Sequence, residues 1–132
     1  MAGSFTDADV ERVLGRMTVL ISELPGVTVS ARHGNTAYVL RGTSFAMAVG
    51  DHHGDGRLAV WVRASRDEQE ALVAARPDRY FVPPYLVPRG WVAACVGPDD
   101  GADWDELAAL VERAWRMGAT RAAVRELDGR RG

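Results

Sequence analysis

Hydrophobic side chains recur every three or four positions at the start of the chain and at every second position in the stretch that follows, up to about residue 63. From residue 10 onward the first pattern follows helical spacing, and Thr6 with Asp9 forms an approximate capping box before it. The pattern predicts an amphipathic helix over residues 7–24, ended by a Pro-Gly pair.

Short runs rich in Val, Tyr and Thr follow this helix, and pairs of turn-forming residues separate them. Because their apolar positions alternate, we expect them to form antiparallel strands with short connections. The expected strands lie near residues 27–32, 36–41, 44–50 and 57–63, the last two being joined by the polar loop 51–56.

Capping residues mark further helices in the second half of the chain. Ser65 with Glu68 forms a full capping box, and Asp103 with Glu106 caps a second amphipathic run. The two prolines within Tyr80–Tyr85 exclude a central strand there, so we expect an ordered loop or a sheet edge. The other expected elements are a helix ending near Ala75, a strand over 91–96, a helix ending at Gly118 and a short helix near 120–127. This order predicts an α+β fold in which helices cover one face of an antiparallel sheet.

Strand alternation predicts which side chains face the helices. The bulky aliphatic side chains should point inward, namely Phe45, Met47, Val49, Leu58, Val60 and Val62. The opposite face would then be an open floor of small residues carrying Trp61, Arg57 and Arg63, with Arg41 joining it from the preceding strand.

The chain has 132 residues, 47% of them hydrophobic and 26% charged, which is typical of one globular domain. We expect this domain to span residues 1–132, with an end that is frayed from about residue 128. All 16 basic residues are arginines, so Schiff-base and Walker lysines are excluded. The net charge of −2 gives no overall attraction to nucleic acid, and such binding would need a local patch. A single cysteine, Cys95, excludes an intrachain disulfide, and neither a targeting segment nor a membrane span is evident, so we expect a cytoplasmic protein.

The residue types at the expected open face suit the binding of anions. An indole among guanidinium groups can receive a stacked base and its phosphates, an acidic peptide or a small anion, although an ordinary amphipathic sheet face has the same composition. A second basic stretch, residues 116–131, carries five arginines against Glu126 and Asp128. Such neighbouring opposite charges are more typical of a solubilising helix than of a DNA contact.

Neither a metal site nor a catalytic site is expected. The loop with Asp51, His52, His53 and Asp55 holds metal-ligand residue types, but it lacks partners at zinc-site spacing and is better explained as a flexible hairpin loop. The nucleophile-elbow, phosphate-loop and metalloprotease motifs are absent. Cys95 lies in an apolar run and is interpreted as a small buried hydrophobic residue, so we expect a protein that is not an enzyme and needs no cofactor.

Several ordered segments resemble the MmcQ/YjbR family over nearly the whole chain. They are Leu40–Ala46, Arg76–Tyr85, Gly90–Val92 and the helix that runs from Asp103 to Trp115. The resemblance implies a CyaY-like α+β domain, often described as a double-wing DNA-binding module without established catalytic residues or cofactor. Members commonly carry a basic residue where this chain has Thr43 and Ser44, which lowers the expected affinity for phosphates.

The sequence thus favours a small binding domain with DNA as its partner. The residues expected to contact nucleic acid are Arg41, Arg57 and Arg63 on phosphates, Trp61 on a base or sugar, and Arg79 and Arg89 beside the proline loop. The alternative is a protein- or small-ligand-binding module that uses the same face or the rigid apolar rim at Tyr80–Tyr85.

Overall fold

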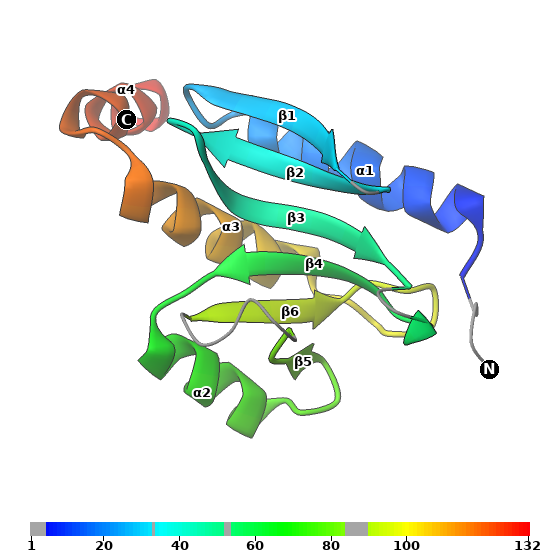
Figure 1. The fold of residues 1–132 in the computed structure, drawn as a ribbon. Helices are drawn as coiled ribbons and strands as arrows, with labels where there is room; N and C mark the ends of the chain where they lie inside the picture. Colours follow the sequence, from blue (N-terminus) through cyan, green and yellow to red (C-terminus); the bar gives the residue numbers. More distant parts are fainter. Residues whose placement is uncertain (1–4, 33, 52–53, 84–89) are drawn as a thin grey trace.

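The computed structural model describes residues 5–32, 34–51, 54–83 and 90–132, and it has the expected α+β architecture (Figure 1). One antiparallel sheet has the strand order β1-β2-β3-β4-β6-β5. The strands are β1 (Val27–Arg32), β2 (Asn35–Leu40), β3 (Thr43–Gly50), β4 (Leu58–Arg63), β5 (Tyr80–Phe81) and β6 (Trp91–Cys95). The helices are α1 (Asp7–Ser22), α2 (Arg66–Ala75), α3 (Trp104–Gly118) and α4 (Arg121–Arg131).

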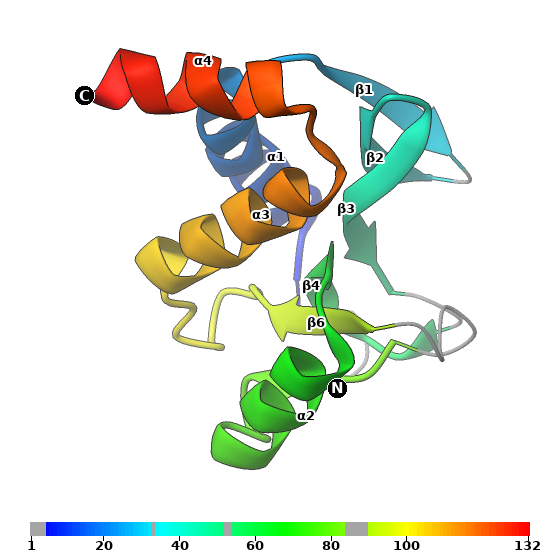
Figure 2. The ribbon, with the colours of Figure 1, turned by 90° about the vertical axis from the view of Figure 1, so that its left-hand side faces the viewer.

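The main core lies between the sheet and the helices α1 and α3, which pack on the same face (Figure 2). Val13, Met17 and Trp115 are completely buried there. The indole nitrogen of Trp115 donates a hydrogen bond of 3.0 Å to the carbonyl of Pro25, so its polar atom is satisfied inside the core. The prediction that helices cover one face of the sheet is confirmed.

The predicted alternation in β3 is wrong beyond its third residue. Val39 pairs with Ser44 and Tyr38 with Ala46, so Phe45 is an extra residue without a partner across the β2–β3 ladder. Such a bulge shifts every later side chain to the other face. The small residues Ala46 and Ala48 therefore pack in the main core, while the large residues Met47 and Val49 lie on the helix-free face.

Trp61 lies on the helix-free face, as its strand position predicts, but it is not open to solvent. Only 4% of its surface is exposed, and it belongs to a second apolar cluster. The buried members of this cluster are Val49, Ala59, Trp61, Trp91 and Ala93, with Met47 and Phe81 packed against them. The expected floor of small residues with an exposed indole is therefore a packed apolar layer.

Some element boundaries also differ from those expected. Arg41 lies in the turn between β2 and β3 and not in a strand, α1 ends two residues before the expected residue 24, and α4 continues to Arg131. The proline-rich stretch begins as the short edge strand β5, in agreement with the expectation of a loop or edge; residues 84–89 lie outside the described part of the chain.

Candidate nucleic-acid interface

The residues predicted for the site are not brought together on one surface. Arg57 immediately precedes β4 and Arg63 ends it, so the strand separates them by about 20 Å. The Arg57 guanidinium lies over the Phe81 ring, with its central carbon 4.2 Å from the ring centre. Arg89 lies outside the described residues, and the contact roles of all six residues stay predictions.

Arg79 is held on the helix side of the molecule. Its side chain is only 15% exposed, and its Nη2 atom donates a hydrogen bond of 3.0 Å to the carbonyl of Gly101. Its Nη1 atom lies 3.8 Å from a carboxylate oxygen of Glu106, which also accepts a hydrogen bond from the Tyr80 hydroxyl. This network ties β5 to the start of α3 and leaves Arg79 little freedom to reach a ligand.

Arg41 occupies the first position of the two-residue turn that joins β2 to β3. Its φ is 53° and that of Gly42 is 80°, so both residues have the left-handed conformation that matches a tight hairpin. The side chain is exposed, and its Nη1 atom lies 3.4 Å from the carbonyl oxygen of Gly118 at the end of α3. This contact places the turn beside the link between α3 and α4.

Most arginines with described side chains pair with a carboxylate within 4.0 Å. Among the described side chains, those without such a partner are Arg16, Arg41, Arg57, Arg63, Arg121 and Arg125. Arg16 instead lies over the Trp104 ring, 5.3 Å from its centre.

Four of these arginines belong to one end of the molecule, which we call the basic end: Arg41, Arg63, Arg121 and Arg125. Arg41 reaches Gly118, and Arg63 lines a cleft together with that same glycine. Arg121 begins α4 three residues after Gly118. Arg125 lies one helical turn further along α4, and both arginines are exposed. In Figure 1 the β2–β3 turn and α4 both lie on the left-hand side.

A sequence signal for the basic end exists, although composition alone misses it. The stretches 24–50 and 113–125 contain arginines but neither Asp nor Glu, and the fold brings the β2–β3 turn of the first beside the α3–α4 link of the second. Arg113 and Arg116 of the second stretch are neutralised by Glu68, Glu112 and Asp128.

Loops with several carboxylates lie at the opposite end of the sheet. Asp51 and Asp55 follow β3, and Asp99 and Asp100 follow β6, on the right-hand side of Figure 1. The length of β3 separates the two ends by about 25 Å. The slightly acidic chain therefore carries a local excess of unpaired positive charge at one end.

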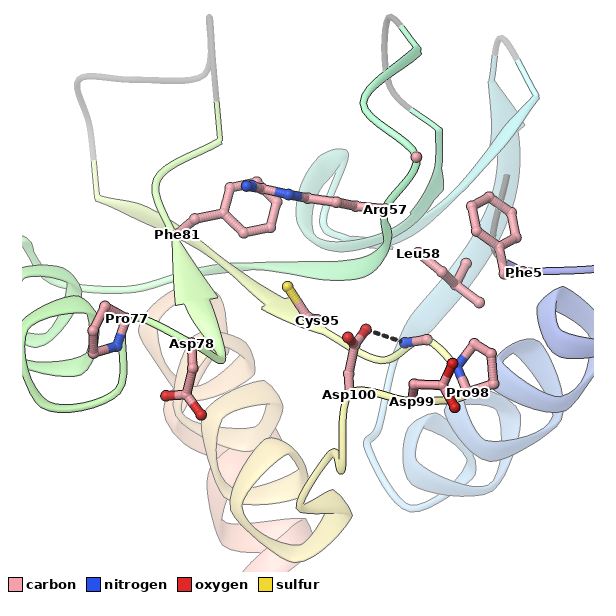
Figure 3. Close-up of a pocket in the computed structure, with 12 residues that line it drawn as sticks. Phe5, Arg57, Leu58, Pro77, Asp78, Phe81, Cys95, Pro98, Asp99 and Asp100 are labelled. Carbon is pink, nitrogen blue, oxygen red and sulfur yellow. Dashed lines mark hydrogen bonds between the residues drawn. The ribbon is translucent and has the colours of Figure 1, made fainter. Parts of the chain in front are cut away.

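A cavity of about 240 Å³ lies at this acidic end, between the Arg57–Phe81 pair and the turn at Gly97 (Figure 3). The amide of Gly97 donates a hydrogen bond of 2.7 Å to Asp100, which closes the turn. Cys95 is the last residue of β6 and borders the cavity as a half-buried residue, whereas the sequence predicts a small buried hydrophobic residue. Burial is the main cause that raises the pKa of this thiol, so the neutral form dominates at neutral pH.

Among the described residues, His, Cys, Asp and Glu side chains nowhere form a group of three suited to a metal ion. His52 and His53, the histidines considered for a metal, lie outside the described part of the chain. No described helix is both long and apolar enough to cross a bilayer.

Comparison with known proteins agrees with this architecture. The YjbR family model matches residues 22–117, while no curated protein matches the chain. The crystal structure of protein DR2400 from Deinococcus radiodurans, described as a DUF419 domain, is similar with a TM-score of 0.68 and 16% sequence identity, over 87% of each chain. At this identity the likeness shows a shared fold, and the family match covers well over half of the chain. The chain belongs to the YjbR family.

Proposed function

We propose that the chain is a non-catalytic DNA-binding domain that contacts phosphates through the basic end. The observation that carries the proposal is the gathering of Arg41, Arg63, Arg121 and Arg125, none of which has a carboxylate within 4.0 Å among the described residues, at one end of a bipolar molecule. Unpaired guanidinium groups suit phosphate oxygens, because they donate two parallel hydrogen bonds and release counterions on binding.

The backbone at Arg41 supports the same proposal. The first position of such a turn favours Asn, Asp or Gly, and a left-handed residue with a long side chain costs about 1 kcal/mol. Backbone strain of this kind is often found at functional positions. A long cation at the tip of a hairpin can reach a phosphate that lies beyond the body of the protein.

The proposed surface differs from the open sheet face that the sequence suggested. Trp61 is buried and Arg57 lies at the acidic end, so neither residue belongs to the basic end. Of the residues that the sequence predicts for the site, Arg41 and Arg63 belong to the basic end, while Arg121 and Arg125 come from the stretch whose charge pattern is more typical of a solubilising helix.

The experiment is a fluorescence-anisotropy titration with duplex DNA over a range of salt concentrations. We compare the natural chain with the double variant Arg63→Gln/Arg121→Gln and with the control Arg57→Gln, which also removes an exposed arginine without a carboxylate partner but from the other end. Each lost phosphate contact should reduce the slope of log affinity against log salt by about 0.9 in duplex DNA. We expect the double variant to lose slope and affinity and the control to keep both.

Two results would contradict the proposal. One is the absence of binding by the natural chain at low salt. The other is a loss of affinity per removed charge that is as large in the control Arg57→Gln as in the double variant, because it would show that the charge matters without regard to its place.

The cavity in Figure 3 favours a second candidate, the binding of a small zwitterionic molecule such as a free amino acid. Arg57 offers a cation on one wall and Asp99 a carboxylate on the other. Binding to the folded state raises the thermal midpoint. The test measures the thermal midpoint of unfolding with each amino acid added at millimolar concentration. A midpoint that no amino acid raises would exclude this candidate.

A further inference from the structure

A small cleft opens within the basic end, between the β2–β3 turn and the last turn of α3. Its floor is apolar and consists of Leu40, Phe45 and Ala114, all of which are buried. Met117 forms one wall with a side chain that is 58% exposed, an unusual exposure for a large apolar residue of this chain. The cleft exists because α3 ends in Gly118, whose missing side chain leaves space beside Leu40.

The size of the cleft limits what can enter it. Its volume is about 130 Å³, below the range of roughly 300–1,000 Å³ that is usual for cofactor and metabolite sites. Cavities of about 150 Å³ take one benzene ring. The cleft therefore suits a single six-membered ring, and the fused rings of a purine are too large to enter completely.

The lining of the cleft also includes two hydroxyl-bearing residues and one arginine. Thr43 and Ser44, whose hydroxyl groups can both donate and accept hydrogen bonds, line the cleft from β3, and Arg63 lines it from the end of β4. Arg41 lies beside it through its contact with Gly118. An occupant with a flat ring, polar ring edges and neighbouring negative charges matches this arrangement.

A nucleotide with an unstacked pyrimidine base has these three properties. In a duplex the ring faces are stacked and inaccessible, whereas single strands offer them to protein side chains. A methionine sulfur also makes favourable contacts with aromatic rings. We propose that the cleft accepts one pyrimidine base of a single-stranded nucleic acid, while Arg41 and Arg63 hold the flanking phosphates. This inference rests on the proposed function and specifies its preferred substrate.

The first part of the test compares natural-chain affinities for oligo(dT), oligo(dA) and duplex DNA of about 15 nucleotides at one salt concentration. Because one base of oligo(dT) can enter the cleft, the affinity for oligo(dT) should exceed the affinity for the duplex by at least about fivefold. Oligo(dT) should also bind more tightly than oligo(dA). Equal affinities for oligo(dT) and duplex, or tighter binding of oligo(dA), would overturn the inference.

The second part fills the cleft without changing any charge. In Gly118→Leu the new Cβ would lie 3.7 Å from a Leu40 methyl group, at ordinary contact distance, and because Gly118 lines the cleft we expect the rest of the side chain to fill it. The matched control is Gly15→Leu on α1, where a Cβ meets nothing within 4 Å. We expect Gly118→Leu to lose the preference for oligo(dT) and to keep the salt dependence of duplex binding, and the control to keep both.

A second variant covers the case in which Gly118→Leu does not fold. Met117→Ala removes an exposed wall of the cleft, and its thermal midpoint should stay close to that of the natural chain while its affinity for oligo(dT) falls. An unchanged preference for oligo(dT) in both folded variants would overturn the inference but leave duplex binding in place. A natural chain that binds neither form of DNA at low salt would overturn the inference together with the proposed function.

Discussion

At Arg41 the proposed binding and the local backbone energy favour different side chains. It has a φ of 53° in a turn position where Asn is better accommodated, and its side chain donates a long hydrogen bond of 3.4 Å to the carbonyl of Gly118. The Arg-Gly pair predicts a turn here, but strand alternation places Arg41 in the preceding strand, and the direction of its side chain toward α3 depends on a partner 77 positions away in the chain.

The variant Arg41→Asn should therefore change stability and binding in opposite directions. Asn adopts the left-handed conformation more easily, so the free energy of unfolding should stay level or rise by up to about 1 kcal/mol in urea denaturation. Affinity for DNA should fall because a phosphate contact is lost. Loss of stability together with unchanged affinity would contradict the role given to Arg41.

Gly90 illustrates a residue that the backbone geometry requires. Its φ is 81°, and a Cβ at this position would overlap the carbonyl oxygen of Ala64, while the Ala64 amide donates a hydrogen bond of 2.5 Å to the Gly90 carbonyl. Gly34 has the same φ of 81° but a Cβ there would meet nothing within 4 Å.

Comparing Gly90→Ala with Gly34→Ala separates steric overlap from backbone strain. Gly34→Ala should lower the free energy of unfolding by about 1–2 kcal/mol through strain alone. Gly90→Ala should cost a further 1–3 kcal/mol, roughly, because the backbone of Ala64 must move. Chemical denaturation measures both values, and equal losses would show that the close approach is not real.

Helix α4 is docked mainly by charges and one buried side chain. Leu127 is 1% exposed, and around it Arg131 pairs with Glu23 and Glu112 while Arg116 pairs with Asp128 and Glu112. Because α4 carries Arg121 and Arg125, this docking positions half of the basic end.

We predict that the docking of α4 weakens in acid. Burial raises the pKa of Glu112, but hydrogen bonds from Arg131 and Arg116 outweigh it, so the pKa lies below the ordinary 4.5. A hydrogen bond from Arg116 likewise holds the pKa of Asp128 below 3.8. Carboxyls with a lowered folded pKa stabilise the folded state fully above their ordinary values, and this contribution is lost as the pH falls through the folded values.

Hydrogen-exchange protection of α4 relative to α3 measures this effect. The relative protection should decrease as the pH drops below about 4.5, and Glu112→Gln should reduce both its value near neutrality and its pH dependence. Protection of α4 that falls only in parallel with that of α3 would contradict the electrostatic account of docking.

The order and type of the elements could be predicted from periodicity and capping residues, but the two faces of the sheet could not. Strict alternation in β3 fails at Phe45, because the pairing with β2 inserts an extra residue there and nothing in the local sequence marks it. The prediction that Trp61 is exposed is wrong for a related reason, since burial on the helix-free face depends on Trp91 and Phe81 from later segments.

At the scale of the whole molecule, the distribution of charge matters more than its sum. A net charge of −2 predicts no overall attraction to DNA, yet the fold places Arg41, Arg63, Arg121 and Arg125 at the end of the molecule that lies about the length of β3 away from the acidic loops. The sequence alone could not reveal this, because pairs such as Arg113–Glu68 and Arg79–Glu106 neutralise charges that lie far apart along the chain.

The most direct test is a map of backbone amide chemical shifts during a titration with DNA at low salt. If DNA binds at the basic end, the largest changes should occur in residues 41–44 and 118–125, while residues 97–103 at the acidic end should keep their shifts. Largest changes in residues 97–103, or shifts that do not change at any residue, would contradict it.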